Sequence, residues 1–424
     1  MLYLRDALYL DSNSFALTPG HLAVEEGPTG SVRPVAAIPP APDRAPGDSV
    51  YDCHGRIVTR AFGCGHHHIY SALSRGMPPA PNVPESFLEI LQLIWWRLDK
   101  CLDMDMIASS AQVCAAALAK NGVTFCLDHH ASPHCVEGSL ARIAEAFDAV
   151  GVGHLLCYEI SDRDGPEIAR QGLAEHEAFF RSGGKGHVGL HASFTVSDDT
   201  LHAAVDLARR YGTGVHIHVA EAAYDQEHCR ATYGKSVIRR LQDAGALDLP
   251  KTVLGHCVHL SDEDREILAD SPCWIAQNAE SNCNNNVGLA GYGYSRNVMF
   301  GTDGMHSDMV RSAQAAHFLG IGREGLSCAG AYERFRNIHR HTALHEGCGD
   351  GDNNLVILED SSPTPVRPEN FLGHFFYGLT ARDVGAVISR GRLIVSGGRL
   401  LTCDEAEMLA KAREQADRLW RKLG

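Results

Sequence analysis

Several features that mark other protein classes are missing from this sequence of 424 residues. No run of about 18 apolar residues occurs, which speaks against a membrane-spanning helix, and the first residues lack the basic flank and apolar run of a signal peptide. None of the 14 cysteines forms a Cys-x-x-Cys pair, which speaks against a disulfide framework. We therefore expect a cytoplasmic protein with reduced thiols and no membrane partner.

Positive charge is also scarce. The chain has 38 Lys and Arg against 52 Asp and Glu, a formal net charge of −14, so nucleic acid is not an expected partner. Two catalytic motifs are absent as well. There is no Gly-x-Ser-x-Gly elbow, and Gly234-Lys235-Ser236 has Cys229 where a phosphate loop needs its first glycine.

From about residue 120 the sequence repeats one pattern, an amphipathic run that ends at Gly or Asn-Gly and is followed by a short apolar run. Such cycles predict alternating helices and strands. The predicted strands are 57–64, 122–128, 152–159, 186–192, 213–219, 252–257, 273–278 and 297–303. Eight β/α units over about 250 residues have the size of a TIM-type barrel, whose active site gathers at the C-terminal strand ends. An open doubly wound sheet is the alternative, but it would more often show a Gly-rich loop.

The two ends of the chain predict a second unit, because both contain short strands and turns. A polar helix over 404–422 closes the chain. We expect an α/β fold with a distorted (β/α)8 barrel over 57–354. Residues 1–56 and 355–424 would then form one small β-sandwich that includes the C-terminal helix.

Titratable side chains stand at most of the predicted strand ends. His66, His67 and His68 follow the first strand, and alternation along a strand places His66 and His68 on one face and His67 on the other. The other strand ends carry Asp128-His129-His130, His191, His218 with Glu221, His256, and Asp303. A barrel would bring these groups into one site.

This set contains the donors that a catalytic zinc site needs. Three imidazoles and one carboxylate suit one divalent ion, zinc or alternatively iron: His66, His68, His218 and Asp303. Such an ion lowers the pKa of bound water to about 7. Glu221 is then the candidate for carrying protons to a leaving group, and His256 for orienting the hydroxide.

The order of these motifs resembles the amidohydrolase superfamily, in particular its cytosine/guanine deaminase and chlorohydrolase branch. The resemblance rests on H-x-H, "HIHVAEAAYD", "GHCVHLSDED", "SN" and "GTDG", and it covers essentially the whole chain. "HIYSALSRGM", "WWRLD", "LDHHASP", "CYEISDRDG" and "FLGHFFYGL" are similar to SsnA-type aminohydrolases. The resemblance implies the metal ligands named above, and it implies that Glu221, His256 and Asp303 are catalytic.

The resemblance also implies contacts to a small heterocyclic substrate. His191, in "LHASFTVSD", stands where this branch often has a substrate-contacting histidine. Asn282 follows Ala279, where the branch commonly has proline, so its loop is less stiff. One of His129 and His130 could line the pocket while strand alternation turns the other outward; we place His129 in the pocket and leave the role of His130 open.

The predicted activity is a metal-dependent hydrolytic deamination, in which metal-bound hydroxide attacks a ring carbon and ammonia leaves. A chlorohydrolase or a cyclic amide hydrolase would begin with the same attack. The amine is favoured because a glutamate that protonates the leaving group is needed for ammonia and not for chloride.

Two further alternatives are a binuclear hydrolase and a non-catalytic metal-binding barrel. The binuclear enzymes that this chain resembles carry a carboxylated lysine on strand four, and here the nearest lysine, Lys185, precedes that strand. The complete ligand set with Glu221 speaks against a non-catalytic barrel. We expect a homodimer.

Overall fold

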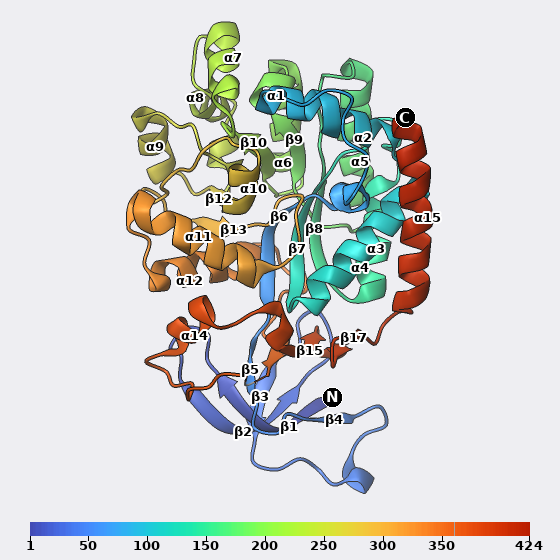
Figure 1. Ribbon diagram of the computed structural model, residues 1–424, viewed down its shortest axis with the longest axis vertical. Coiled ribbons are helices and arrows are strands. Elements are labelled where there is room, and N and C mark those ends of the chain that lie inside the picture. The colour runs from blue at the N-terminus through green and yellow to red at the C-terminus, as the bar shows by residue number, and fades with distance from the viewer. Residues whose placement is uncertain (360) are drawn as a thin grey trace.

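Eight parallel strands form the centre of the upper part of the molecule in the computed structural model, which describes residues 1–359 and 361–424 (Figure 1). Hydrogen bonding groups them into two sheets, with the orders β6-β7-β8 and β13-β12-β11-β10-β9. Their bounds are β6 Phe62–His67, β7 Val123–His130, β8 Gly153–Tyr158, β9 Val188–Ala192, β10 Val215–Val219, β11 Val253–His256, β12 Trp274–Gln277 and β13 Val298–Phe300. Strands β7 to β13 lie where the sequence predicts them.

Isolated bridges connect these two sheets at both edges. Leu156 pairs with Gly186 and Ile160 with Leu190 at one edge, and His67 pairs with Asp303 at the other. The arrangement is a mixed α/β fold consistent with a TIM-like barrel, in which regular ladders do not close the sheets.

The first predicted strand, 57–64, is two strands in the structure. β5 (Ile57–Arg60) pairs antiparallel with β14 (Leu355–Leu358) and parallel with β1 (Leu2–Leu10), whereas β6 pairs with β7. The single-strand prediction is wrong because a short, mostly buried run carries no period that would reveal a break.

Strands from both ends of the chain form one further sheet, which lies below the parallel strands in Figure 1. Its order is β17-β16-β15-β14-β5-β1-β2-β3, with β4 beside β1. The remaining bounds are β2 Leu17–Val24, β3 Val32–Val35, β4 Ser49–Asp52, β15 Val384–Ser389, β16 Arg392–Ser396 and β17 Arg399–Leu400. Hydrogen bonds join all nine strands, so the expected β-sandwich is not confirmed as a separate domain.

Most helices surround the parallel strands, whereas α1 lies above their C-terminal ends and α14 lies beside the nine-stranded sheet (Figure 1). Their bounds are α1 Phe87–Ile90, η3 Leu91–Trp95, α2 Trp96–Cys101, α3 Met104–Lys120, α4 Ser139–Val150, α5 Pro166–Arg181, α6 Asp198–Arg210, α7 Ala223–Tyr233, α8 Val237–Asp243, α9 Asp262–Ala269, α10 Ala279–Asn284, α11 Met309–Glu324, α12 Cys328–Arg336, α13 Ile338–Thr342 and α14 Phe371–Tyr377. Side-chain caps begin several of them; Ser197, for example, accepts the Thr200 N–H at the start of α6.

The C-terminal helix α15 (Glu405–Leu423) runs along α3 and α2, beside the parallel strands (Figure 1). Trp420 Nε1 donates to the Leu73 carbonyl at 2.8 Å, and Arg418 pairs with Asp103 at 2.8 Å. The sequence instead predicts that this helix belongs with the terminal strands. An amphipathic pattern indicates that one face of a helix is buried, but it does not identify the element against which that face packs.

Within the described residues, no single helix is long and apolar enough to cross a membrane. The helical segments Phe87–Cys101 and Met104–Lys120 reach that length and composition together, but they are bent by 109° relative to each other.

Candidate metal centre and active site

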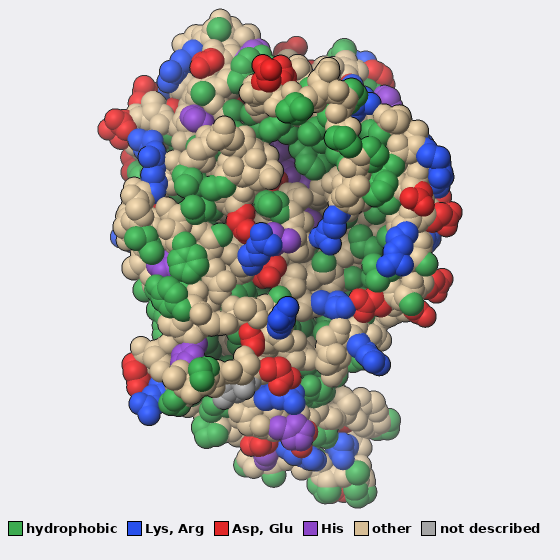
Figure 2. Space-filling model, viewed as in Figure 1, with side chains coloured by type: hydrophobic (Ala, Val, Ile, Leu, Met, Phe, Trp, Pro, Cys, Tyr) green, Lys and Arg blue, Asp and Glu red, His purple; other side chains and the backbone are tan. Residues whose placement is uncertain are grey.

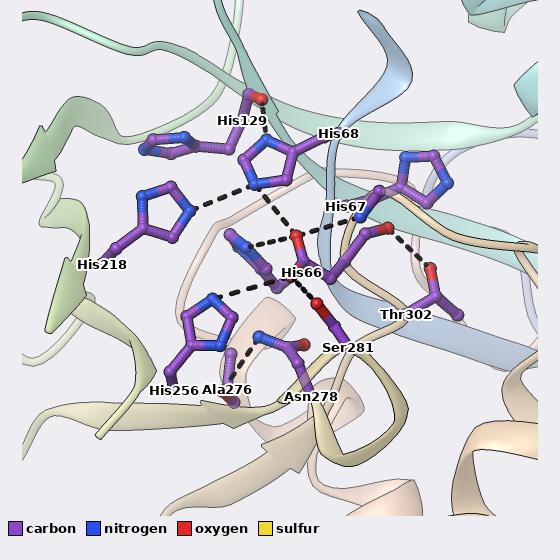
Figure 3. Close-up of polar contacts among 12 residues, drawn as sticks. His66, His67, His68, His129, His218, His256, Ala276, Asn278, Ser281 and Thr302 are labelled. Carbon is purple, nitrogen blue, oxygen red and sulfur yellow. Dashed lines mark hydrogen bonds and ion pairs between the residues drawn. The ribbon is translucent and has the colours of Figure 1, made fainter. Parts of the chain in front are cut away.

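Strand β6 separates the three consecutive histidines as side-chain alternation predicts (Figure 3). The rings of His66 and His68 both lie 5.1 Å, centroid to centroid, from the ring of His218. His67 points away from them, and its Nε2 lies 2.9 Å from Ser307 Oγ. His66 and His68 therefore share one cluster, and His67 is outside it.

The four residues predicted as metal ligands converge at the C-terminal ends of the parallel strands. His68 Nε2 lies 3.1 Å from His218 Nε2 and 3.1 Å from Asp303 Oδ1. His66 Nε2 lies 3.6 Å from the same Asp303 oxygen. All four side chains are buried, so water competes little for their donor atoms.

Hydrogen bonds on the far side of two rings turn Nε2 toward the centre. His68 Nδ1 lies 2.6 Å from the His129 carbonyl oxygen, and His218 Nδ1 lies 2.8 Å from the His191 carbonyl oxygen. Because a carbonyl oxygen only accepts, both Nδ1 atoms carry hydrogen. An imidazole anchored in this way presents Nε2 to a metal.

Two rings of the cluster are neutral, and a third is paired with the carboxylate. Burial lowers the pKa of His66 to about 3 and that of His218 well below its ordinary value, so both rings are neutral at pH 7. Burial also opposes charge on His68, but its hydrogen bond to Asp303 raises its pKa to about 9. Burial disfavours the Asp303 anion too, yet the polar contacts of Asp303 with His66 and His68 hold its pKa well below the usual range.

Two buried nitrogen atoms of this cluster, His66 Nε2 and His256 Nε2, have no hydrogen-bond partner among the described residues. Unpaired buried polar atoms cost free energy and call for a ligand. Imidazole nitrogens with a carboxylate oxygen are the donors that zinc prefers. The residues present therefore fit a divalent ion of this kind.

Glu221 and His256 stand beside Asp303. His256 Nε2 lies 3.5 Å from Glu221 Oε2 and 3.7 Å from Asp303 Oδ2. Asn285 Nδ2 donates to Glu221 Oε1 at 3.2 Å, and His256 Nδ1 lies 2.7 Å from Asn282 Oδ1. Burial raises the pKa of Glu221, so this carboxyl holds a proton more readily than an exposed glutamate does.

Local backbone geometry brings the ends of β13 and β6 together. A Cβ on Gly301 would lie 2.7 Å from the His66 carbonyl oxygen, so the close approach requires glycine. The N–H groups of Thr302 and Asp303 both donate to that carbonyl at 3.1 Å. Asp303 and His256 have φ values of 55° and 68°, which are uncommon outside glycine and concentrate at functional sites.

A pocket opens above the cluster. Its floor is polar and contains His68, His191, His218, Glu221, His256 and Asp303. Its wall is largely apolar and includes Tyr70, Phe87, Leu88, Leu91, Trp95, Phe194, Tyr224 and Met305. Figure 2 shows histidine side chains at the bottom of a recess bordered by hydrophobic ones. The pocket can hold a flat, apolar ligand with its reacting atom at the floor.

The three predicted substrate contacts have different positions. His191 lines the pocket, and its Nδ1 lies 2.7 Å from Thr195 Oγ1. His129 is fully buried behind the wall, where its Nε2 lies 3.1 Å from the His216 carbonyl oxygen. Asn282 contacts His256 and, within the described part of the chain, is not on the pocket wall. Those two positions suit holding other side chains in place.

Glu159, His216 and Ser281 belong to the site but are not predicted from the sequence. Glu159 follows β8 on the pocket wall, and its Oε2 lies 3.2 Å from His129 Nδ1. His216 Nε2 lies 2.8 Å from His66 Nδ1. Ser281 Oγ donates to Asp303 Oδ2 at 2.5 Å. Glu159 is at a strand end and His216 is two residues before His218, so both follow patterns that the sequence already shows. Ser281 is part of the quoted "SN" motif, but no role is predicted for it from the sequence.

Two curated relatives match most of the chain. It is 29% identical to the 5-methylthioadenosine/S-adenosylhomocysteine deaminase of Pelotomaculum thermopropionicum, over 94% of each chain. It is 27% identical to the 5'-deoxyadenosine deaminase of Methanopyrus kandleri, over 84% of each chain.

Solved structures share the fold. An adenosine deaminase from Xanthomonas campestris with bound zinc superposes with a TM-score of 0.80 at 18% identity, covering 99% of this chain and 98% of that one. The atrazine chlorohydrolase TrzN from Arthrobacter aurescens, complexed with zinc, has a TM-score of 0.80 at 17% identity, covering 98% of this chain and 100% of that one. The amidohydrolase family model matches residues 57–343, more than half of the sequence. The chain therefore belongs to the amidohydrolase family.

Proposed function

We propose that this protein removes an exocyclic amino group from a small nitrogen heterocycle by hydrolysis and releases ammonia. Its family and its deaminase-named relatives make it a hydrolase of carbon–nitrogen bonds. The observation that carries the proposal is the position of Glu221, whose Oε2 lies 3.5 Å from His256 Nε2 on the pocket floor, beside the predicted metal ligands.

The proposed cofactor is one divalent ion, zinc first and iron as the alternative. His66, His68, His218 and Asp303 would hold it, and when bound it supplies the Lewis acidity that lowers the pKa of water to about 7. The zinc in the two solved structures supports the choice of metal. Strand β9 has no lysine, which supports a single ion at this site.

The side chains beside the proposed metal position would carry out proton transfer and orient the attacking water. Glu221 would take a proton from the attacking water and deliver it to the departing amine, so that the C–O bond forms, the C–N bond breaks and ammonia leaves neutral. Asn285 holds one oxygen of Glu221 and leaves the other facing His256. His256, oriented by Asn282, would position the attacking water.

An aminopurine nucleoside with an apolar substituent is the substrate class that we propose to test first. The names of the relatives suggest adenosine derivatives. The apolar wall of Phe87, Leu88, Leu91 and Trp95 offers a surface for such a substituent, since apolar area removed from water is favourable.

We further infer that the isolated bridges between the two parallel sheets complete a distorted (β/α)8 barrel, which begins after β5 and not at residue 57, where the sequence predicts its start. The nine-stranded sheet would then be the small second unit. The homodimer and the cytoplasmic location stay predictions.

Ammonia release from zinc-loaded protein tests the function. The panel should contain adenosine derivatives, guanine, cytosine and a pterin, with a chlorotriazine as the chlorohydrolase arm and Glu221→Gln as the inactive control. Ammonia from at least one amino compound is the expected result. Chloride release without any ammonia would show a chlorohydrolase instead.

A further inference from the structure

A second cluster of histidines lies at the opposite ends of the parallel strands. His187 directly precedes β9, about 13 Å of strand before His191 of the pocket floor. Its ring centroid lies 5.2 Å from that of His341 and 5.1 Å from that of His345, which are 5.3 Å from each other. The three rings thus form a nearly equilateral triangle.

The chain presents two of these side chains on one face of a helical turn. His341 belongs to α13, and the turn continues beyond the helix through hydrogen bonds from Leu344 N–H to the His341 carbonyl and from His345 N–H to the Thr342 carbonyl, at 3.0 and 2.9 Å. Residues four apart on such a turn are neighbours. His187 approaches them from the start of β9.

Three nitrogen atoms of this cluster are buried and have no hydrogen-bond partner in the part of the chain that the structure describes. They are His187 Nδ1, His341 Nδ1 and His345 Nε2. The side chains of His187 and His341 are fully buried, and His345 is 7% exposed. His345 Nε2 is thus free to take a ligand, and an ion bound through Nε2 of His187 and His341 would leave their Nδ1 atoms as N–H groups.

The donor atoms are spaced for a transition metal. The candidate ligand atoms of the three histidines lie within 4.8 Å of one another, and His187 Nε2 lies 3.1 Å from His341 Nε2. Two nitrogens bound at 2.0–2.1 Å to one tetrahedral zinc are about 3.3 Å apart. The distance between these two Nε2 atoms therefore needs little adjustment, and an ion would replace the hydrogen bond that now joins them.

The protonation of the rings also suits a metal. Burial lowers the pKa of His187 and His341 well below the ordinary value and that of His345 to about 3, so all three are neutral at pH 7 and can offer lone pairs. Lys185 and Lys251 add positive charge near His345, which weakens the binding of any cation. With no carboxylate in the cluster, imidazole ligands select zinc-like ions over calcium or magnesium.

We propose that His187, His341 and His345 bind a second divalent ion of the zinc class, at the N-terminal ends of the parallel strands. The ion would connect the start of β9 to the segment after α13, which are about 150 residues apart in the sequence. Its role is to stabilise the fold, and the inference is independent of the proposed reaction.

Metal counting on the full-length protein tests the site. After dialysis against a chelator, the protein is loaded with zinc, freed of excess and analysed for metal per chain. The expected content is two ions for the unchanged protein, one for His345→Ala and one for His218→Ala. His202→Ala, on the exposed face of α6, is the matched control and should retain two.

Cobalt absorption and thermal unfolding identify which of the two sites holds the ion. In His218→Ala, added cobalt should give the visible absorption of a tetrahedral nitrogen site, and added zinc should raise Tm. Both effects should be largely lost in the double variant with His345→Ala, in which only the weakened catalytic site remains. One ion in the unchanged protein, or two ions in folded His345→Ala, overturns the proposal. If circular dichroism shows that His345→Ala does not fold, His345→Gln takes its place, with the same expected metal content of one ion per chain.

Discussion

His216 of β10 lies directly behind His66 of β6, with 2.8 Å between His216 Nε2 and His66 Nδ1. Burial lowers the pKa of His216 well below its ordinary value, so the ring is neutral and its Nε2 can accept the hydrogen of His66 Nδ1. The His216 ring is also 5.7 Å from that of His187. His216 thus contacts a predicted metal ligand on one side and the second histidine cluster on the other.

Replacing His216 should weaken metal binding at the catalytic site without abolishing it. His216→Leu removes the group that fixes the orientation and tautomer of His66, and such outer partners contribute about 10- to 100-fold to metal affinity. Competition with a chromophoric chelator measures the change, with His202→Ala as the control. An unchanged affinity would show that His66 needs no support from His216.

His67 should be dispensable for the metal. Its ring is turned toward Ser307 and away from His218, so His67→Ala should lower stability by about 1–3 kcal/mol, through the loss of a buried, hydrogen-bonded side chain, and leave the metal content unchanged. His66→Ala is the matched comparison and should lose the ion. Metal analysis and urea unfolding of both variants decide; loss of the ion from His67→Ala would contradict the orientation of this strand.

Substitutions of Glu221 and His218 should lower the activity for different reasons. Glu221→Gln keeps the size and shape of the side chain but cannot accept and donate a proton as a carboxyl group does. We therefore expect it to retain the metal and to lose about 10²- to 10⁴-fold in kcat. His218→Ala removes a predicted ligand and should lose metal from the catalytic site, with activity partly restored by added zinc. Metal content and ammonia release separate the two; near-normal turnover of Glu221→Gln would refute its role in proton transfer.

His176 should make the fold sensitive to acid. Its Nδ1–H donates to the Gly172 carbonyl at 2.7 Å, and its Nε2 accepts the N–H groups of Tyr158 and Gly189 at 3.0 Å each. Burial lowers its pKa to about 4. Below pH 6.5 the His176 side chain therefore binds a proton in the unfolded chain but not in the folded one. The free energy of unfolding then falls as the pH drops from 6.5 toward 4.

The expected loss from this one residue is about 2 kcal/mol between pH 7 and pH 5. Urea unfolding at both pH values measures it. His176→Gln should be less stable at pH 7 but should lose about 2 kcal/mol less than the unchanged protein on acidification, whereas the exposed His202→Gln should follow the unchanged protein. Equal acid losses in all three proteins would contradict the assignment.

Most of the side chains predicted for the site lie together in the structure, because strand ends are a local feature of the sequence. The alternation of His66 and His67 depends on residues that are neighbours in the chain, whereas the close approach of Asp303 to His66, which Gly301 permits, is a tertiary contact. The same rule applied to β8 and β10 would also have identified Glu159 and His216. His129 and Asn282 are less predictable, because a strand pattern does not tell a pocket wall from the layer behind it.

By itself, the sequence determined the succession of helices and strands, the face on which each histidine of β6 lies, and the residues that gather at the C-terminal strand ends. Side-chain periods of 2 and 3.6 and the special conformations of glycine encode these features locally. The tertiary structure alone decided that β5 leaves the parallel strands to pair with β14, that α15 packs on α3, and that His187 meets His341 and His345. Those contacts join segments far apart in the chain, and their energy comes from burial and hydrogen bonding that exist only after the chain has folded.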